Sequence, residues 1–196
     1  MNGVLNLNHY LVKEHTGIFK ASNSYDVFNP EDGNKVIECR EENLGFFTKM
    51  FRFTKYKTMT PFDFKVQTPT GEKILQVKRG VTFFVSKVEV LDSQGKLIGM
   101  FKQKFFSLGG KFDVLDANGN VLCALKGSWT GWDFKFLKDK TEFAHVTKKW
   151  AGIGKELFTS ADNYVLSIDQ SIPQDNPVRL LIFAAVMCID MVLKEK

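Results

Sequence analysis

Residues 88–98, VEVLDSQGKLI, and residues 112–122, FDVLDANGNVL, share one pattern: an alternating apolar run, a polar turn with Gly, and a second apolar run. Alternation with a period of two residues places one face of each run in a core, as in a β-strand. An Asp that opens the turn and a Gly that closes it with a positive φ are typical of hairpins. The pattern therefore predicts two antiparallel β-hairpins whose starts lie 24 residues apart.

The hairpin pattern is an internal repeat. It occurs again at residues 25–37 and 64–77, and a weaker fifth copy covers residues 134–146. Further strand candidates between the copies are residues 9–19, 46–53, 81–86 and 105–106. These segments add up to roughly a dozen strands, the scale of a closed barrel or a large sandwich.

The C-terminal part breaks the alternation and predicts a helix. Asn176 followed by Pro177 is typical of an N-cap and first helical residue, and residues 178–193 are apolar except for Arg179 and Asp190. Sixteen residues rise about 24 Å, whereas a bilayer core requires about 30 Å and ~20 residues. We therefore favour a helix buried in protein over one that spans a membrane.

A helix that is apolar on all sides requires a wall on all sides. We expect about 12 antiparallel strands to close into this wall, so the fold class is mainly β with an enclosed C-terminal helix. The 19 Phe residues would then be inward-facing rings that pack against the helix. Asp190 opposes the helix dipole at the C-terminal end, so we expect it to have a partner, either Lys194 or a strand of the barrel.

Length and composition indicate one domain over residues 1–196, with the barrel at about 9–170 and the helix at about 177–194. The isolated Cys39, Cys123 and Cys188 argue against a disulfide-framed secreted domain. The net charge of +5 weakly favours an anionic partner. No signal peptide is evident at the N-terminus. We expect a cytoplasmic protein, and this location is compatible with peripheral attachment to a membrane.

Three blocks of sequence resemble the phospholipid scramblase family. They are KKWAGI at residues 148–153, ELFTSADNY at residues 156–164 and AAVMCID at residues 184–190. The LURP-one-related proteins of plants are similar in the same way. The resemblance implies the Tubby C-terminal-like fold, a 12-stranded barrel around a hydrophobic C-terminal helix, and it covers nearly the whole chain. It also singles out Trp150, Gly152 and Asp190 as structural residues.

The family resemblance further implies a calcium loop at residues 160–171, with Asp162, Asn163 and Asp169 as its acidic and amide ligands. The residues themselves favour a strand, because Tyr164, Leu166 and Ile168 alternate and the sixth loop position is Val165 where an EF-type loop requires Gly. We therefore expect no cofactor. Animal members of the family carry a palmitoylated Cys cluster, which this chain lacks.

Basic residues occur in pairs, among them Lys102 with Lys104 and Lys148 with Lys149. Alternating lysines on a strand are usually a solvated face, but the same residues are candidates for contacts with anionic lipid headgroups. No Ser-His-Asp, HExxH or Walker pattern occurs, so we expect no enzyme. No recognition helix is evident, so we expect no nucleic acid partner; the sequence names no protein partner.

These observations lead to a scramblase-like, membrane-associated protein that binds an anionic phospholipid surface and takes part in transbilayer phospholipid movement. The alternative is a soluble regulatory or scaffold protein, similar to the LURP-one-related proteins, with no scrambling activity. A third hypothesis requires the terminal helix to leave the barrel and span a membrane.

Overall fold

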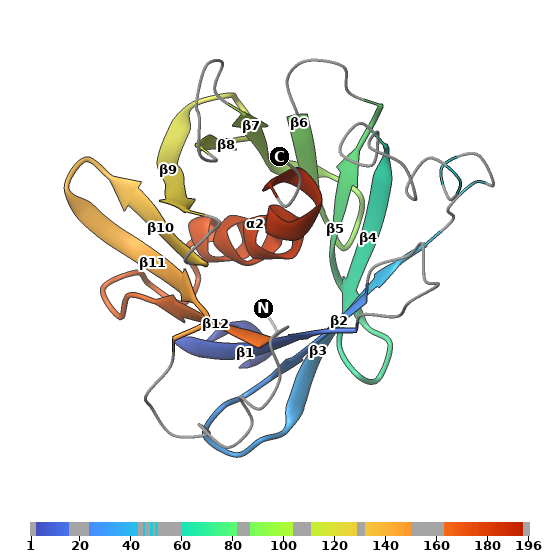
Figure 1. Ribbon diagram of the computed structural model, residues 1–196, viewed down its shortest axis with the longest axis horizontal. Coiled ribbons are helices and arrows are strands. Elements are labelled where there is room, and N and C mark those ends of the chain that lie inside the picture. Colours follow the sequence, from blue (N-terminus) through green and yellow to red (C-terminus); the bar gives the residue numbers. More distant parts are fainter. Residues whose placement is uncertain are drawn as a thin grey trace.

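The structure is a closed barrel of twelve antiparallel strands around one α-helix (Figure 1). The computed structural model describes residues 3–15, 24–42, 45, 48, 50, 60–81, 87–103, 111–128, 132–149 and 163–193. A short 3₁₀ helix, η1 (Gly3–Leu5), precedes the barrel, and α2 (Pro177–Leu193) ends the described part of the chain. The strands are β1 (His9–Glu14), β2 (Ser24–Phe28), β3 (Lys35–Glu41), β4 (Phe62–Gln67), β5 (Lys73–Arg79), β6 (Lys87–Asp92), β7 (Leu97–Gln103), β8 (Phe112–Asp116), β9 (Val121–Ser128), β10 (Asp133–Lys138), β11 (Thr141–Thr147) and β12 (Asn163–Ile168).

The five copies of the sequence repeat are the five hairpins β2–β3, β4–β5, β6–β7, β8–β9 and β10–β11. In the fourth hairpin the Asp116 carboxylate accepts the N–H groups of Asn118 and Asn120, each at 2.8 Å, and Gly119 has φ +89°. The turn after Asp92 repeats this arrangement. The predicted turn chemistry is therefore confirmed.

The expected count of about twelve strands is confirmed, but not every predicted segment is one of the strands. Five hairpins supply ten strands, and β1 and β12 pair with each other to close the barrel. The extra strand candidate at residues 46–53 is wrong where it is described, because Thr48 and Met50 are helical. The candidates at residues 82–86 and 105–106 lie outside the described residues.

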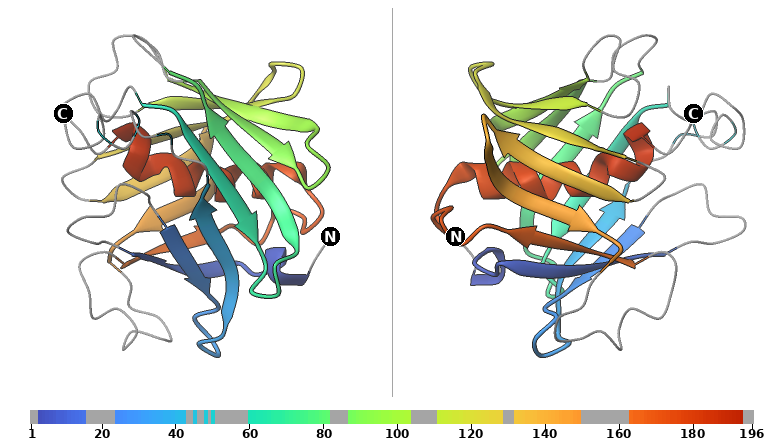
Figure 2. Two further views of the ribbon diagram at one scale, coloured as in Figure 1. Left: turned by 90° about the vertical axis from the view of Figure 1, so that its right-hand side faces the viewer. Right: turned by 60° about the vertical axis from the view of Figure 1, so that its left-hand side comes forward.

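Helix α2 runs through the barrel from one open end to the other (Figure 2). Asn176 caps it, because its side-chain oxygen accepts the N–H of Val178 at 3.0 Å. The seven consecutive residues Leu181 to Met187 are all buried, so every face of the helix contacts protein. The predicted buried core helix is confirmed, and no helix in the described part of the chain is long and apolar enough to cross a membrane.

Arg179, one of the two charged residues in the helix, ties the start of α2 to the N-terminal segment. Its buried guanidinium donates hydrogen bonds to the carbonyl oxygens of Ile172 and Leu7 and to the side chain of Asn8. Burial raises the pKa of the neighbouring Tyr10 phenol to about 12, so this phenol stays neutral. The Tyr10 ring lies edge-on to Phe183 of the helix, with ring centroids 5.6 Å apart.

Gly99 of β7 lies close both to the next strand and to α2. A Cβ atom at this position would lie 2.5 Å from the carbonyl oxygen of Leu115 in β8 and 2.7 Å from a side-chain carbon of Leu181 in the helix. The first of these atoms is backbone and cannot rotate away. A glycine is therefore required here by the neighbouring strand, and the helix side chain narrows the space further.

We predict that Gly99→Ala lowers the free energy of unfolding by about 1–3 kcal/mol, the usual cost of overpacking a core. Urea denaturation followed by circular dichroism measures this change. Gly3→Ala is the control, because its Cβ would meet no atom within 4 Å and should change stability by less than about 0.5 kcal/mol. Equal urea midpoints for Gly99→Ala and Gly3→Ala would contradict the close contact of Gly99 with Leu115 and Leu181.

Candidate functional site

The two open ends of the barrel differ in the sequence of their connections. We call the end with the hairpin turns and the start of α2 the turn end, and the opposite end the loop end. The connections at the loop end are residues 15–23, 42–61, 80–86, 104–111, 129–132 and 148–162. They contain ten basic and three acidic residues and ten of the 19 Phe, whereas the turn-end connections contain two basic and six acidic residues and no Phe. The connections of the two ends therefore differ in charge and in Phe content.

The predicted headgroup lysines that are described all lie at the loop end. Lys102 is near the end of β7 and Lys149 follows β11, and both side chains are exposed. Three strands separate β7 from β11 around the wall, so at about 4.8 Å per strand these lysines lie on different arcs of the same rim. The fourth predicted residue, Lys104, lies outside the described residues.

At the loop end, the side chain of Lys148 lies over a pair of stacked aromatic rings. Its ammonium lies 4.3 Å from the ring centroid of Trp132, and that ring stacks on Tyr164 with centroids 5.3 Å apart. Trp132 also meets Phe134 edge-on. The indole thus joins a surface cation to the buried rings of the barrel.

We predict a coupling free energy of about 0.5–1 kcal/mol between Lys148 and Trp132, the usual size of an exposed cation–π contact. A double-mutant cycle of Lys148→Met and Trp132→Leu in urea denaturation measures it. Lys149→Met combined with Trp132→Leu is the matched control and should give a coupling near zero. The same coupling for both lysines would contradict the arrangement.

Asn163 and Asp169, the two described ligands of the calcium loop that the family resemblance implied, are not brought together. Residues 163–168 form strand β12, as the alternation predicted. Asn163 is buried at the loop end of this strand, and Asp169 is exposed beyond its turn end, where it accepts the N–H of Ser171. Six residues of extended chain separate the two by roughly 20 Å, and Asp162 lies outside the described residues. The described residues contain no group of three or more His, Cys, Asp or Glu side chains placed to hold a metal ion.

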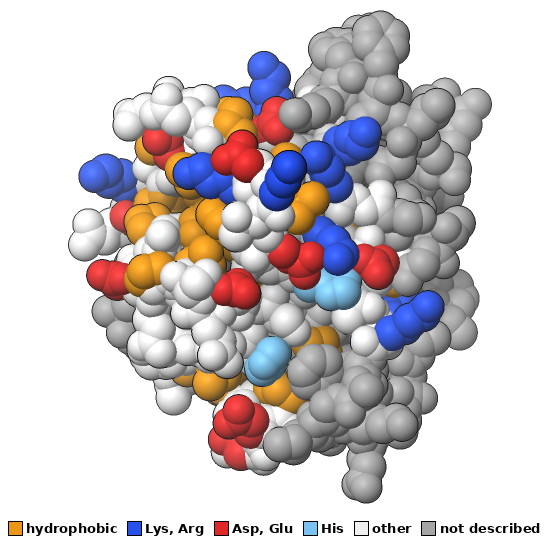
Figure 3. Space-filling view, turned by 90° about the vertical axis from the view of Figure 1, so that its left-hand side faces the viewer, with side chains coloured by type: hydrophobic (Ala, Val, Ile, Leu, Met, Phe, Trp, Pro, Cys, Tyr) orange, Lys and Arg blue, Asp and Glu red, His pale blue; other side chains and the backbone are white. Residues whose placement is uncertain are grey.

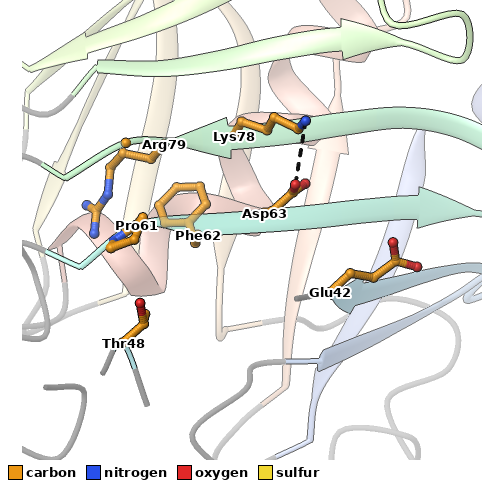
Figure 4. A pocket seen from close by; sticks show the side chains of 8 residues that line it. Glu42, Thr48, Pro61, Phe62, Asp63, Lys78 and Arg79 are labelled. Carbon is orange, nitrogen blue, oxygen red and sulfur yellow. Dashed lines mark ion pairs between the residues drawn. The ribbon is translucent and has the colours of Figure 1, made fainter. Parts of the chain in front are cut away.

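A pocket of about 330 Å³ opens at the rim of the loop end, and we call it the rim pocket (Figure 4). It is lined by Glu42, Thr48, Pro61, Phe62, Asp63, Lys78, Arg79 and Gly80. Phe62 and Arg79 are opposite each other in the register of β4 and β5 and both are buried, whereas the next pair, Asp63 and Lys78, is more exposed and forms an ion pair at 3.5 Å. The pocket therefore combines a buried cation, an aromatic ring and an exposed ion pair.

The outer wall over β11, β12 and β1 carries a second hollow, of about 430 Å³. His9 and Ser167 are cross-strand neighbours joined by a 3.1 Å hydrogen bond, and His145 lies opposite Ser167 on the other side and contacts Asp133 at 3.0 Å. Acidic and basic side chains are interspersed on this face (Figure 3). No single charge dominates it, in contrast to the loop end.

The structure describes the side chains of two of the three cysteines singled out in the sequence, but not those of the residues expected to be structural. Cys39 and Cys123 are buried free thiols, and burial raises the pKa of the Cys123 thiol to about 12, which makes it unreactive. Trp150, Gly152 and the side chain of Asp190 lie outside the described residues.

Sequence reasoning missed Trp132 and the lining of the rim pocket. Phe62 and Arg79 are 17 residues apart in the chain and meet only because the register of β4 and β5 pairs them. The sequence did contain one signal. Arg79 continues the alternating apolar positions of its strand and should therefore face the core, whereas an arginine is usually exposed.

Comparison with known proteins agrees with this architecture. The family model for scramblases matches residues 11–196, which include the whole barrel and α2. The chain belongs to the scramblase family. It is 22% identical over 191 residues to the human protein named phospholipid scramblase family member 5. The aligned region makes up 90% of this chain and 68% of the human protein.

A second similar protein is the yeast protein named altered inheritance rate of mitochondria protein 25. It is 22% identical over 183 residues, which are 81% of this chain and 55% of the Saccharomyces cerevisiae protein. The chain therefore spans only about half of that relative. No solved structure gives a significant match.

Proposed function

We propose that this scramblase-family chain is a non-enzymatic phospholipid-binding module that docks on anionic bilayers with the loop end of its barrel. The observation that carries the proposal is the difference between the connections of the two ends: those at the loop end hold ten basic residues and ten Phe, whereas those at the turn end have an acidic excess and no Phe. Basic side chains attract anionic headgroups, and aromatic rings suit the interface between headgroups and acyl chains. The scramblase family match and the name of the human relative support the same ligand class.

In this proposal the helix remains enclosed while the barrel binds. Residues 181–187 of α2 are buried on every side, and Arg179 anchors the start of the helix at the turn end, away from the bilayer. Membrane attachment would then be peripheral, and transbilayer movement of phospholipids would arise from docking of the loop end rather than from a membrane-spanning helix.

We predict that the double variant Lys102→Glu/Lys149→Glu weakens binding to vesicles of phosphatidylserine and phosphatidylcholine by at least about tenfold. Each basic residue near an anionic surface contributes about 1 kcal/mol, and 1.4 kcal/mol corresponds to a factor of ten. Vesicle co-sedimentation at two salt concentrations measures the change, and binding of the unmodified chain should weaken with salt.

The matched control is Lys96→Glu/Lys140→Glu, because both residues lie in turn-end connections. This control should bind vesicles as the unmodified chain does. Equal losses in both double variants would refute docking by the loop end. If the unmodified chain binds no vesicles at low salt, the scaffold alternative replaces the proposal. A dithionite assay on reconstituted vesicles tests the transbilayer step, for which we expect faster lipid exchange than in protein-free vesicles.

A further inference from the structure

We infer that the rim pocket binds the headgroup of a zwitterionic phospholipid whose cation is a primary ammonium group. This inference rests on the proposed function and deepens it, because it assigns a headgroup class to a defined site at the loop end. The pocket volume of about 330 Å³ lies at the lower end of the range for small-molecule sites. It suits a headgroup rather than a whole lipid.

The phosphodiester half of such a headgroup matches Arg79. This side chain is only 3% exposed, yet it lines the pocket. Its guanidinium is fixed from two sides, because it donates a 2.6 Å hydrogen bond to the carbonyl oxygen of Thr60 and lies 4.7 Å from the centroid of Phe62. A guanidinium held in place presents a fixed positive charge to phosphate oxygens at little entropic cost.

The ammonium half matches two carboxylates in the same lining, Glu42 and Asp63. Each of them faces a partly buried lysine at a long distance, Glu42 with Lys65 at 3.6 Å and Asp63 with Lys78 at 3.5 Å. Partly exposed ion pairs of this kind contribute little to stability, so a ligand ammonium can replace the lysine at little cost. The lining holds two acids and two bases, which favours a zwitterion over a net anion.

The aromatic side chain in the pocket selects against choline. A quaternary ammonium is usually recognised by open aromatic faces, but among the described lining residues the aromatic ring is that of Phe62, and the Arg79 guanidinium already lies over it. A primary ammonium instead donates three hydrogen bonds, which carboxylates accept. An ethanolamine headgroup therefore fits this pocket better than choline.

Apolar side chains beside the pocket point to a lipid rather than to a free headgroup. Val81, next to Gly80 in the lining, is 61% exposed, and Met50, two residues after Thr48, is 49% exposed. Large exposed hydrophobic residues next to a polar pocket provide a place for glycerol and acyl chains. The charged lining takes the headgroup in this arrangement.

Isothermal titration with glycerophosphoethanolamine and glycerophosphocholine tests the inference. We expect the ethanolamine compound to bind about tenfold more tightly, because hydrogen bonds between charged groups separate the two ligands. Glu42→Gln and Asp63→Asn should each abolish most of this preference while the fold is kept, since both side chains are partly exposed and the substitutions conserve shape. Glu31→Gln, in a turn-end connection, is the matched control and should leave the preference unchanged.

A second arm separates the sources of the headgroup. Neutral phosphatidylcholine vesicles with and without phosphatidylethanolamine are compared, and we expect stronger co-sedimentation with the latter lipid. Equal affinity for the two soluble compounds, or a preference that survives both carboxamide variants, would overturn the inference. Binding of the soluble compound without a gain on vesicles would overturn the lipid as its source. If binding to anionic vesicles persists in any of these cases, the proposed function stands and only the headgroup assignment fails.

Discussion

The enclosure of α2 is the constraint on which the rest of the structure depends. A helix whose residues 181–187 are all buried can exist in water only if protein surrounds it, and twelve antiparallel strands close a wall of this size without leaving an edge. The enclosure contributes to the requirement for Gly99, where strand β8 and the helix leave no space for a side chain. It also explains the inward rings of Phe64, Phe134 and Phe136, which are completely buried.

The two ends of the barrel differ in structure. Tight turns and the hydrogen bonds of Arg179 hold the turn end together. The loop end has longer connections, whose sequence is rich in basic residues and Phe. At this end Lys148 lies over the ring of Trp132, and the rim pocket opens between β3, β4 and β5. The proposed docking on a bilayer depends on this difference between the ends.

The sequence predicted the fold well because hairpins and helix caps are local features. The Asp116 turn and the Asn176 cap follow from residues within four positions of each other. The expected inward position of Phe is seen for Phe64, Phe134 and Phe136, whereas ten of the 19 Phe lie outside the described residues. The site was harder to predict, because strand register decides that Arg79 meets Phe62, and because β12 separates Asn163 from Asp169 by its whole length. Such contacts between distant residues leave no periodic signal in one sequence.

Hydrogen exchange of the backbone amides of α2, measured in solution and on anionic vesicles, tests most directly whether the helix stays enclosed. If it does, amides in the middle of α2 exchange only through global unfolding and have the same protection free energy as the most stable barrel strands. This protection should persist unchanged when the chain is bound to vesicles, while protection changes appear at the loop-end ends of the strands. Fast exchange of residues 181–187, or a loss of their protection on vesicle binding, would contradict an enclosed helix.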